Sequence, residues 1–362
     1  MKIGILTGGG DCPGLNAVIR AIVRKGIFHY NDEFVGFLEG WRGVMENMTV
    51  PLDLEAVKGI LPQGGTILRT SRTNPAKKEN GLERCMENLK KNGIDALIAL
   101  GGDDTQSVSL KLFERGVKVV AVPKTIDNDL SGTDLCFGFD TAVSIATEAI
   151  DRVHTTAEAH NRVIVVEVMG RDSGWIALYS GVAGGADVIL IPEQPFDIQE
   201  IADTLKQRHD RGRYFSIVVV AEGAKLASAT AEMERRKKDE FGHVRLGGIG
   251  ATLAAEIESR TGFETRAVVL GHTQRGGSPT AFDRMLATRY GIGAIDLAHA
   301  GKFGCMVSLK GNDIVSVPIS DAIARTRCVS PELIDVANSL REKHTETVAG
   351  MKGDGSRPNG LR

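Results

Sequence analysis

The sequence lacks the features that mark several large classes of protein. Lys and Arg form no block beyond the short run 235–238, and the formal net charge is −2, so nucleic acid is not an expected partner. No apolar run approaches the roughly 18 residues that a membrane-spanning helix needs. The opening residues, MKIGILTGGG, show no signal-peptide pattern. We therefore expect a soluble protein that binds neither membranes nor nucleic acid.

Paired cysteines are also missing. The five cysteines follow no CxxC spacing and stand at Cys12, Cys85, Cys136, Cys305 and Cys328. This scatter indicates a reducing compartment, so a cytoplasmic location is expected. Cys12 precedes a predicted helix, where the pKa of a thiol can fall, although a small buried thiol fits the position equally well.

The composition is that of an ordinary globular protein, with 42% hydrophobic and 25% charged residues in 362. A chain of this length can form two hydrophobic cores, so two domains are expected. Short β-branched runs recur between helical patterns, and their near-continuous apolarity indicates strands buried on both faces of parallel sheets. The runs are 2–7, 94–100, 117–122, 162–168, 187–192, 216–221 and 266–271.

Two segments between these runs have the periodicity of amphipathic helices. Apolar residues recur at helical spacing from Leu15 to Val23, and again from Asp140 to Ala157. Residues 228–248 are polar and charged, which predicts an excursion on the surface. The tail 346–362 has almost nothing to bury and should be disordered.

Glycine-rich loops follow some of the strands, where open parallel sheets bind ligands. TGGGDCPG (7–14) has three consecutive glycines, which let backbone N–H groups approach an anion beside a helix N-terminus. LPQGGTILRTSRTNP (61–75) adds a glycine pair followed by Arg69 and Arg72, which suits a second phosphate. A tight turn in the first case and a solvated loop in the second are the plain alternatives.

Carboxylates stand where an anion should bind. ALGGDDTQS (99–107) places Asp103 and Asp104 between a strand and a helix, an unexpected position for negative charge. In PKTIDND (123–129), Asp127 and Asp129 stand two residues apart beside the hydroxyl of Thr125, which suits a base with an orienting partner. An ordinary Asp/Asn turn also fits this heptapeptide.

Two further loops place arginine among glycines. VMGRDSG (168–174) carries Arg171, and GHTQRGGSP (271–279) carries His272 and Arg275. A guanidinium matches phosphate oxygens in a bidentate way, so these loops suit a phosphate monoester.

Together, GGGDCPGLN, GGDDT, PKTIDND, VMGRDSG, the AEG around Glu222 and GHTQRGGSP resemble the phosphofructokinase family. The resemblance runs in the family's order from Lys2 to about residue 340. It implies transfer of a phosphoryl group to the 1-hydroxyl of fructose 6-phosphate, in glycolysis or gluconeogenesis. It also implies an α/β fold of two Rossmann-like three-layer αβα domains with mostly parallel sheets and the active site in the cleft between them.

The resemblance further predicts how the chain is divided. Residues 1–138 with about 274–324 would form a larger domain for the phosphoryl donor and Mg²⁺. Residues from about 139–273 with 325–345 would form a smaller domain for fructose 6-phosphate. In this family Arg162 and Arg266 come from the neighbouring subunit, so a homodimer or homotetramer with shared sites is expected.

The family's residue roles apply to the matching positions. Asp127 resembles the base that takes the proton from the sugar hydroxyl, and Asp103 resembles the Mg²⁺ carboxylate, which makes Mg²⁺ the expected cofactor. The implied catalytic set is Asp127, Thr125, Asp129, Arg171, Lys124 and Asp104. The implied donor-binding set is Gly9, Gly10, Gly102, Asp104, Lys124 and Arg72. The implied sugar-binding set is Thr125, Ile126, Asp127, Arg162, Met169, Gly170, Arg171, Glu222, Arg266, His272, Thr273, Gln274 and Arg275.

The family uses either ATP or inorganic pyrophosphate as donor, and two positions mark the division. ATP-using members of the bacterial type typically have Gly where this chain has Asp104 and Lys124, whereas the Asp and Lys pair is usual in pyrophosphate-using members. The Asp104 carboxylate would occupy the space of the α-phosphate of ATP, and one unit-charge pair at about 4 Å costs roughly 4 kcal/mol at an effective dielectric of about 20. Lys124 would pair with the phosphates, or alternatively form a structural salt bridge with Asp103 or Asp104.

Pyrophosphate is therefore the predicted donor. The glycine loops also resemble those of pyrophosphate-using members of the actinobacterial type, and a reversible reaction is expected. Three alternatives stay open: an ATP-dependent phosphofructokinase, a non-catalytic sugar-phosphate-sensing subunit, and a lipid or NAD kinase. Asp103, Asp127, Asp129 and Arg171 are all present, which disfavours the second, and the third explains neither PKTIDND nor GHTQRGGSP.

Overall fold

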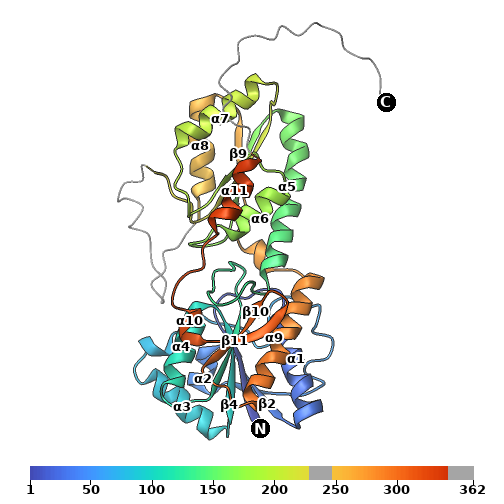
Figure 1. Ribbon diagram of the computed structural model, residues 1–362, viewed down its shortest axis with the longest axis vertical. Helices are drawn as coiled ribbons and strands as arrows, with labels where there is room; N and C mark the ends of the chain where they lie inside the picture. Colours follow the sequence, from blue (N-terminus) through green and yellow to red (C-terminus); the bar gives the residue numbers. More distant parts are fainter. Residues whose placement is uncertain (228–246, 341–362) are drawn as a thin grey trace.

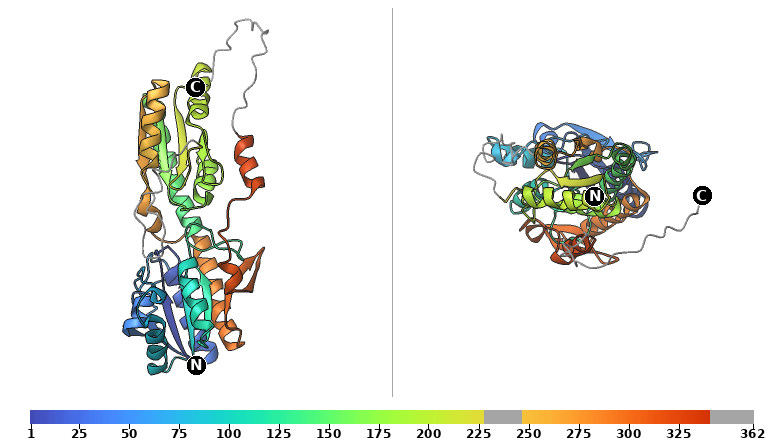
Figure 2. Two further views of the ribbon diagram at one scale, coloured as in Figure 1. Left: turned by 90° about the vertical axis from the view of Figure 1, so that its left-hand side faces the viewer. Right: turned by 90° about the horizontal axis from the view of Figure 1, so that it is seen from above.

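The computed structural model describes residues 1–227 and 247–340. The surface excursion predicted at 228–248 falls almost wholly outside these residues, and the tail predicted at 346–362 falls wholly outside them. The chain forms two lobes, each built on one β-sheet (Figure 1). Seen from the side, the lobes are stacked along the long axis of the molecule (Figure 2). The predicted α/β fold with two mostly parallel sheets is confirmed.

The larger lobe holds a seven-stranded sheet in the order β11-β10-β5-β4-β1-β2-β3. Its five central strands run parallel, and each edge strand pairs antiparallel with its neighbour. The strands β4 and β5 are buried at every position, as their apolar sequences predict. The seven strands are β1 (Lys2–Thr7), β2 (Glu33–Phe37), β3 (Thr49–Leu52), β4 (Ala96–Gly101), β5 (Val119–Pro123), β10 (Cys305–Lys310) and β11 (Asp313–Pro318).

Helices cover both faces of this sheet. The helices α1 and α9 pack on one face, and α2, α3 and α4 pack on the other. The predicted helix after the first strand is confirmed, because the apolar stripe of α1 is buried against the sheet. The helical elements are α1 (Leu15–Lys25), α2 (Trp41–Glu46), α3 (Gly81–Lys91), α4 (Asp103–Phe113), α9 (Ala281–His299) and α10 (Ile319–Ala322), with the π-helical η1 (Gly26–Tyr30) and the 3₁₀ turn η2 (Pro75–Lys77).

The smaller lobe holds four parallel strands in the order β7-β8-β6-β9. The helices α5 and α6 cover one face, and α7 and α8 cover the other. The strands are β6 (Val163–Val168), β7 (Val188–Leu190), β8 (Ser216–Ala221) and β9 (Thr265–Val269). The helical elements are α5 (Phe139–His160), α6 (Trp175–Ala183), α7 (Ile198–Asp210), α8 (Ile249–Thr261), η4 (Gly271–Arg275) and α11 (Pro331–Ser339). Within the described ranges, no helix is both long and apolar enough to cross a bilayer.

One predicted strand is less buried than its sequence indicates. The run 266–271 forms β9, which lies at the edge of the four-stranded sheet. Its residue Val269 is 54% exposed. The prediction of burial on both faces is therefore wrong for β9, since an edge strand is covered by fewer neighbours than the central strand β8, which is buried throughout.

The two lobes share a hydrophobic core. Side chains from β1, α1 and α9 of the larger lobe are continuous with side chains from α5 and β6 of the smaller one. The chain passes between the lobes three times: at the start of α5, before α9, and between α10 and α11 (Figure 1). The predicted domain limits, 1–138 with 274–324 and 139–273 with 325–345, fall near these crossings and stay a proposal.

The fully buried Tyr290 of α9 provides a test of this packing. Its hydroxyl donates to the carbonyl of Leu135 at 2.5 Å and lies 2.8 Å from the hydroxyl of Thr133. The change Tyr290→Phe removes both of these buried hydrogen bonds and leaves the Leu135 carbonyl with only the 3.1 Å bond from the Thr133 hydroxyl, so we expect the free energy of unfolding to fall by about 1–3 kcal/mol. Urea unfolding followed by circular dichroism measures this change.

The matched control is Tyr214→Phe, because the side chain of Tyr214 is 53% exposed. Its effect should stay within about 0.5 kcal/mol. Equal effects of the two substitutions would contradict the structural role given to the Tyr290 hydroxyl.

Candidate active site

A pocket lies between the lobes and receives residues from both. Because the carboxyl ends of β1, β4 and β5 meet at one edge of the larger sheet, loops that are far apart in the sequence converge there. The smaller lobe adds the loop after β6, and η4 adds its last residue. The lining residues are Gly9, Gly10, Arg72, Gly102, Asp103, Asp104, Thr105, Lys124, Thr125, Asp127, Asp129, Arg171 and Arg275.

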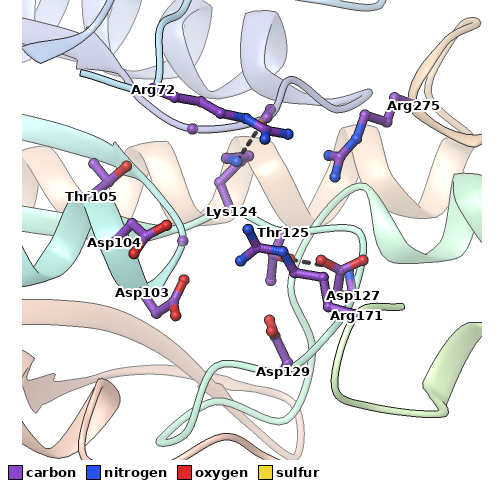
Figure 3. A pocket seen from close by; sticks show the side chains of 13 residues that line it. Arg72, Asp103, Asp104, Thr105, Lys124, Thr125, Asp127, Asp129, Arg171 and Arg275 are labelled. Carbon is purple, nitrogen blue, oxygen red and sulfur yellow. Dashed lines mark hydrogen bonds between the residues drawn. The ribbon is translucent and has the colours of Figure 1, made fainter. Parts of the chain in front are cut away.

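Three of the cations in this pocket are grouped on one side, whereas Arg171 lies among the carboxylates (Figure 3). Arg72, Lys124 and Arg275 lie on one side, and Asp103 and Asp129 lie on the other (Figure 3). A cluster of cations beside a glycine-rich loop can hold phosphate oxygens. The carboxylates opposite can hold a divalent cation or accept a proton.

The backbone of the loop between β1 and α1 lines the pocket at Gly9 and Gly10, which carry no side chains. Gly9 has a φ of +76°, in the region that favours glycine. A Cβ atom on Gly10 would lie 2.5 Å from Nη1 of Arg275. The same Nη1 donates to the carbonyl of Asp11 at 3.2 Å. The arginine of η4 therefore packs directly on the β1–α1 loop of the larger lobe.

The adjacent carboxylates Asp103 and Asp104 form the first turn of α4, after the N-cap Gly102. Free N–H groups and the helix dipole stabilise negative charge at this end of a helix. The turn is held in place by Gln106, whose buried amide donates to carbonyls at the ends of β4 and β5 at 3.1–3.2 Å. The unexpected position of this acidic pair thus has a local electrostatic explanation.

The loop after β5 presents two carboxylates to the pocket. The hydroxyl of Thr125 accepts the N–H of Asp127 at 3.0 Å. Between the two aspartates, Asn128 adopts a φ of 52°, a left-handed conformation that asparagine tolerates better than most residues. One carboxylate oxygen of Asp127, Oδ1, is buried and has no hydrogen-bond partner within the described chain. Such an oxygen indicates a site that a ligand completes.

The carboxylates strongly affect one another. Burial is the largest cause that raises the pKa of Asp129, and together with the charges of Asp127 and Asp103 it brings that pKa to about 7. Burial alone would lower the pKa of the Arg171 guanidinium, but the facing carboxylates of Asp127, Asp103 and Asp104 outweigh burial and raise it. Arg171 therefore offsets much of the negative charge in the pocket.

Lys124 lies beneath the glycine loop with only 3% of its surface exposed. Its ammonium donates to the carbonyl of Gly10. Burial lowers its pKa, and the charge of Arg275 lowers it too. In the part of the chain that the structure describes, Lys124 forms no ion pair with Asp103 or Asp104, so the salt-bridge alternative is not supported.

Several predicted residues support the pocket without lining it. The carboxylate of Glu222 accepts the N–H of Arg171 at 3.2 Å, which ties β8 to the loop after β6. Met169 and Gly170 belong to that same loop, and Met169 is buried. Ile126, which stands between Thr125 and Asp127 in the loop after β5, is also fully buried.

Other predicted residues lie apart from the pocket. In η4, His272 and Thr273 are exposed while Gln274 is buried, so of this segment only Arg275 reaches the lining. Arg162 and Arg266 lie at the starts of β6 and β9. Each forms an ion pair with Glu264, at 2.7 and 2.6 Å. A single chain therefore does not bring these two arginines to the pocket.

The sequence assigned no functional role to Cys12 or Thr105. Cys12 is fully buried, and desolvation raises the pKa of its thiol to about 12 despite the nearby charge of Lys124. Of the two possibilities left open for this cysteine, the structure favours the small buried thiol over a lowered pKa. Thr105 lines the pocket although no argument from the sequence pointed to it beyond its place in GGDDT. It packs against Gly101, where a Cβ atom would lie 2.3 Å from Cβ of Thr105.

The donor set suits a magnesium ion shared with a substrate. Among the described residues, no group of three or more His, Cys, Asp or Glu side chains could hold a metal ion by itself. Mg²⁺ in phosphoryl-transfer sites is usually bound by one or two carboxylates together with substrate phosphates and water. Asp103, which opens into the pocket, fits that arrangement.

Residues 2–298 match the family model described as phosphofructokinase. The chain belongs to the phosphofructokinase family. It is 60% identical over 336 residues to the pyrophosphate–fructose 6-phosphate 1-phosphotransferase of Streptomyces coelicolor, which covers 92% of this chain and 98% of that protein. The corresponding enzyme of Amycolatopsis methanolica is 57% identical, covering 93% and 98%. The ATP-dependent 6-phosphofructokinase of Mycobacterium tuberculosis is 53% identical, also covering 93% and 98%.

Solved structures agree with membership of the phosphofructokinase family. Phosphofructokinase from Pichia pastoris in the T-state aligns with a TM-score of 0.79 at 32% identity, over 94% of this chain and 36% of that one. Pyrophosphate-dependent phosphofructokinase from Marinobacter aquaeolei has the same fold, with a TM-score of 0.79 at 21% identity over 100% and 99% of the two chains.

The raised pKa of Asp129 predicts how stability depends on pH. In the unfolded chain an aspartate has a pKa of about 3.9, so between pH 4 and 7 the folded state keeps a proton that the unfolded state has lost. The free energy of unfolding should therefore decrease as pH rises through this window, by up to about 4 kcal/mol from this group. Urea unfolding in EDTA at pH 5 and pH 8 measures the slope.

The variant Asp129→Asn cannot ionise and should lose this part of the pH dependence, which makes it relatively more stable than the wild type at pH 8. Asp313→Asn, at an exposed position at the start of β11, is the control and should keep the wild-type slope. An unchanged slope in Asp129→Asn would contradict the raised pKa.

Proposed function

We propose that this chain transfers a phosphoryl group from inorganic pyrophosphate to the 1-hydroxyl of fructose 6-phosphate, giving fructose 1,6-bisphosphate and phosphate. The reaction runs in both directions, because a pyrophosphate bond and a sugar phosphate ester are close in free energy of hydrolysis. The observation that carries the proposal is the pair Asp104 and Lys124 in one pocket, beside a glycine loop and the candidate base.

The donor half of the site suits a short polyanion. Backbone N–H groups at Gly10 and Gly102, with Arg72 and Lys124, would hold the phosphates, and Gly9, whose N–H donates to the carbonyl of Ser71 at 3.4 Å, would let them approach the loop. The carboxylate of Asp104 stands in the first turn of α4, where a nucleotide's additional phosphate would meet a like charge. Pyrophosphate lacks that phosphate, so it escapes the repulsion.

The transfer itself needs a base near the nucleophile and cations around the moving phosphoryl group. We assign Asp127 as the group that accepts the proton of the sugar 1-hydroxyl, since its Oδ1 is buried and unpartnered in the described chain. Thr125 fixes the loop through the N–H of Asp127, and Asp129 assists from the same loop. Arg171 stabilises the charge that develops on the phosphoryl oxygens. Mg²⁺ held by Asp103 would neutralise part of the donor's charge.

The sugar half of the site is proposed to need a second copy of the chain. Ile126, Met169, Gly170 and Glu222 would border the sugar. His272, Thr273, Gln274 and Arg275 would supply contacts to its 6-phosphate. Arg162 and Arg266 lie outside the pocket of their own chain, and the Arg266 side chain is 54% exposed, which supports their donation to a neighbouring subunit. The proposed enzyme is a cytoplasmic homodimer or homotetramer.

An ATP-dependent phosphofructokinase is the second candidate. Relatives at 50% and 53% identity carry that name, against 57% and 60% for two relatives named for pyrophosphate. Overall identity therefore separates the donors weakly, and the pair Asp104 and Lys124 at the pocket supports pyrophosphate.

Purified protein assayed with fructose 6-phosphate, Mg²⁺ and each donor tests the proposal. We expect turnover with pyrophosphate and a value of kcat/KM for ATP that is lower by about a thousandfold, the factor that corresponds to roughly 4 kcal/mol. Fructose 1,6-bisphosphate with phosphate should give the reverse reaction. Comparable efficiency with ATP, or no reverse turnover at saturation, would contradict the proposal.

The double variant Asp104→Gly with Lys124→Gly tests which residues select the donor. Removing the carboxylate relieves the repulsion on ATP, and removing the ammonium weakens pyrophosphate binding. We expect kcat/KM to rise for ATP and to fall for pyrophosphate, each by tenfold or more. The single variant Asp104→Asn serves as a control, since it removes the charge but keeps the volume. A parallel loss with both donors would mean that the pair is structural.

A further inference from the structure

The segment between α10 and α11 runs beside the loop that carries Asp127 and Asp129. We name residues 325–329 the clasp. The clasp contacts the residues that follow this loop in the larger lobe. Thr326 pairs with Leu130 in an antiparallel bridge, and the hydroxyl of Ser131 donates to the carbonyl of Arg325 at 2.8 Å. Nearly two hundred residues separate these partners along the chain.

Three successive backbone carbonyls of the loop after β5, those of residues 127–129, each accept a hydrogen bond from a residue outside the larger sheet. The hydroxyl of Ser173 donates to the carbonyl of Asp127 at 3.2 Å. Nη1 of Arg327 donates to the carbonyl of Asn128 at 3.2 Å, and the backbone N–H of Arg327 donates to the carbonyl of Asp129 at 2.7 Å. One clasp residue therefore fixes two successive peptide groups, including the one at the left-handed Asn128.

The clasp also binds the smaller lobe, directly beside the loop of Arg171. The guanidinium of Arg327 lies over the indole ring of Trp175, 4.2 Å from its centroid. Nε1 of Trp175 donates to the carbonyl of Arg327 at 2.8 Å. Trp175 is the first residue of α6, so only three residues separate it from Arg171.

A half-buried carboxylate, that of Glu193, completes this connection. Oε1 of Glu193 accepts the N–H of Val329 in the clasp at 2.9 Å and the N–H of Gly174 at 3.0 Å. The start of α6 and the end of the clasp are therefore bound to the same atom. A shift of the clasp would move both the loop of Arg171 and the loop of Asp127.

We propose that Arg327 is a positioning residue for phosphoryl transfer: it holds the Asp127–Asp129 loop of the larger lobe in register with the Arg171 loop of the smaller lobe. This inference rests on the function proposed above. Arginine suits the position because its planar group can stack on an indole and donate a directed hydrogen bond at the same time. Since Arg327 itself lies outside the pocket lining, its removal should affect the chemical step more than substrate binding.

The test compares Arg327→Ala and Arg327→Lys with the wild type. A misplacement of the reacting groups by about 1 Å can cost on the order of a hundredfold in rate. We expect Arg327→Ala to lower kcat by tenfold to a hundredfold, with less than about threefold change in KM for fructose 6-phosphate or the donor. Added guanidinium at millimolar concentration should restore part of kcat in Arg327→Ala. Arg327→Lys keeps the charge without the planar group and should be intermediate.

The matched control is Arg325→Ala, two residues earlier in the clasp, where the side chain is exposed and the backbone carbonyl makes the contact. It should keep the wild-type kcat. If Arg327→Ala retains the wild-type kcat, or if KM rises and kcat is unchanged, the inference is overturned. The wild type with both donors is measured alongside, so that inactivity of the wild type contradicts the proposed function instead.

Amide hydrogen exchange gives a readout that does not depend on activity. Arg327→Ala should speed exchange at the amides of residues 127–131 by tenfold or more while leaving β4 unchanged, and Arg325→Ala should change neither. The same exchange in Arg327→Ala and wild type would overturn the inference whatever the enzyme's donor is.

Discussion

The placement of Arg171 among four carboxylates is the interaction on which the rest of the site depends. Arg171 follows β6 of the smaller lobe, whereas the carboxylates come from α4 and the loop after β5 of the larger lobe. The residue adopts a left-handed φ of 51°, a conformation that costs an arginine of the order of 1–3 kcal/mol. Its N–H is held by Glu222, and its charge is held by the facing aspartates. The two lobes must therefore stay in register for the pocket to keep its charge balance.

The same requirement explains why so many contacts cross between the lobes near the pocket. Arg275 reaches the β1–α1 loop, Ser173 reaches the loop of Asp127, and the clasp reaches both lobes. The shared hydrophobic core holds the two lobes together but does not by itself fix their orientation, because hydrophobic burial is non-directional. The directional hydrogen bonds fix that orientation. Rigid placement matters here because phosphoryl transfer depends mainly on positioning and electrostatics.

Much of the fold could be predicted from the sequence, because buried parallel strands have near-continuous apolar runs. The strands β1, β4, β5, β6 and β8 follow this rule. The helices α1 and α5 were predicted from a different pattern, the recurrence of apolar residues at helical spacing. The antiparallel strands β3 and β11 did not stand out, since half-exposed edge strands mix polar and apolar residues. The exposed edge of β9 could not be predicted either, because the sequence of a strand does not show how many neighbours it has. The loops that line the pocket were found through their motifs, and Thr105 and the clasp were missed because no local pattern marks a contact between distant residues.

Donor choice shows why a few residues can matter more than overall similarity. Relatives named for pyrophosphate and relatives named for ATP differ by only a few per cent in their identity to this chain. Specificity is a difference between two binding free energies, and a single like charge in a partly buried pocket can supply several kcal/mol of that difference. Asp104 is favourably placed for this role because the first turn of α4 stabilises its charge when no ligand is present. The carboxylate can thus persist beside Asp103 at little cost to the fold, and in the proposed role it would raise the free energy of any bound donor that carries an additional phosphate.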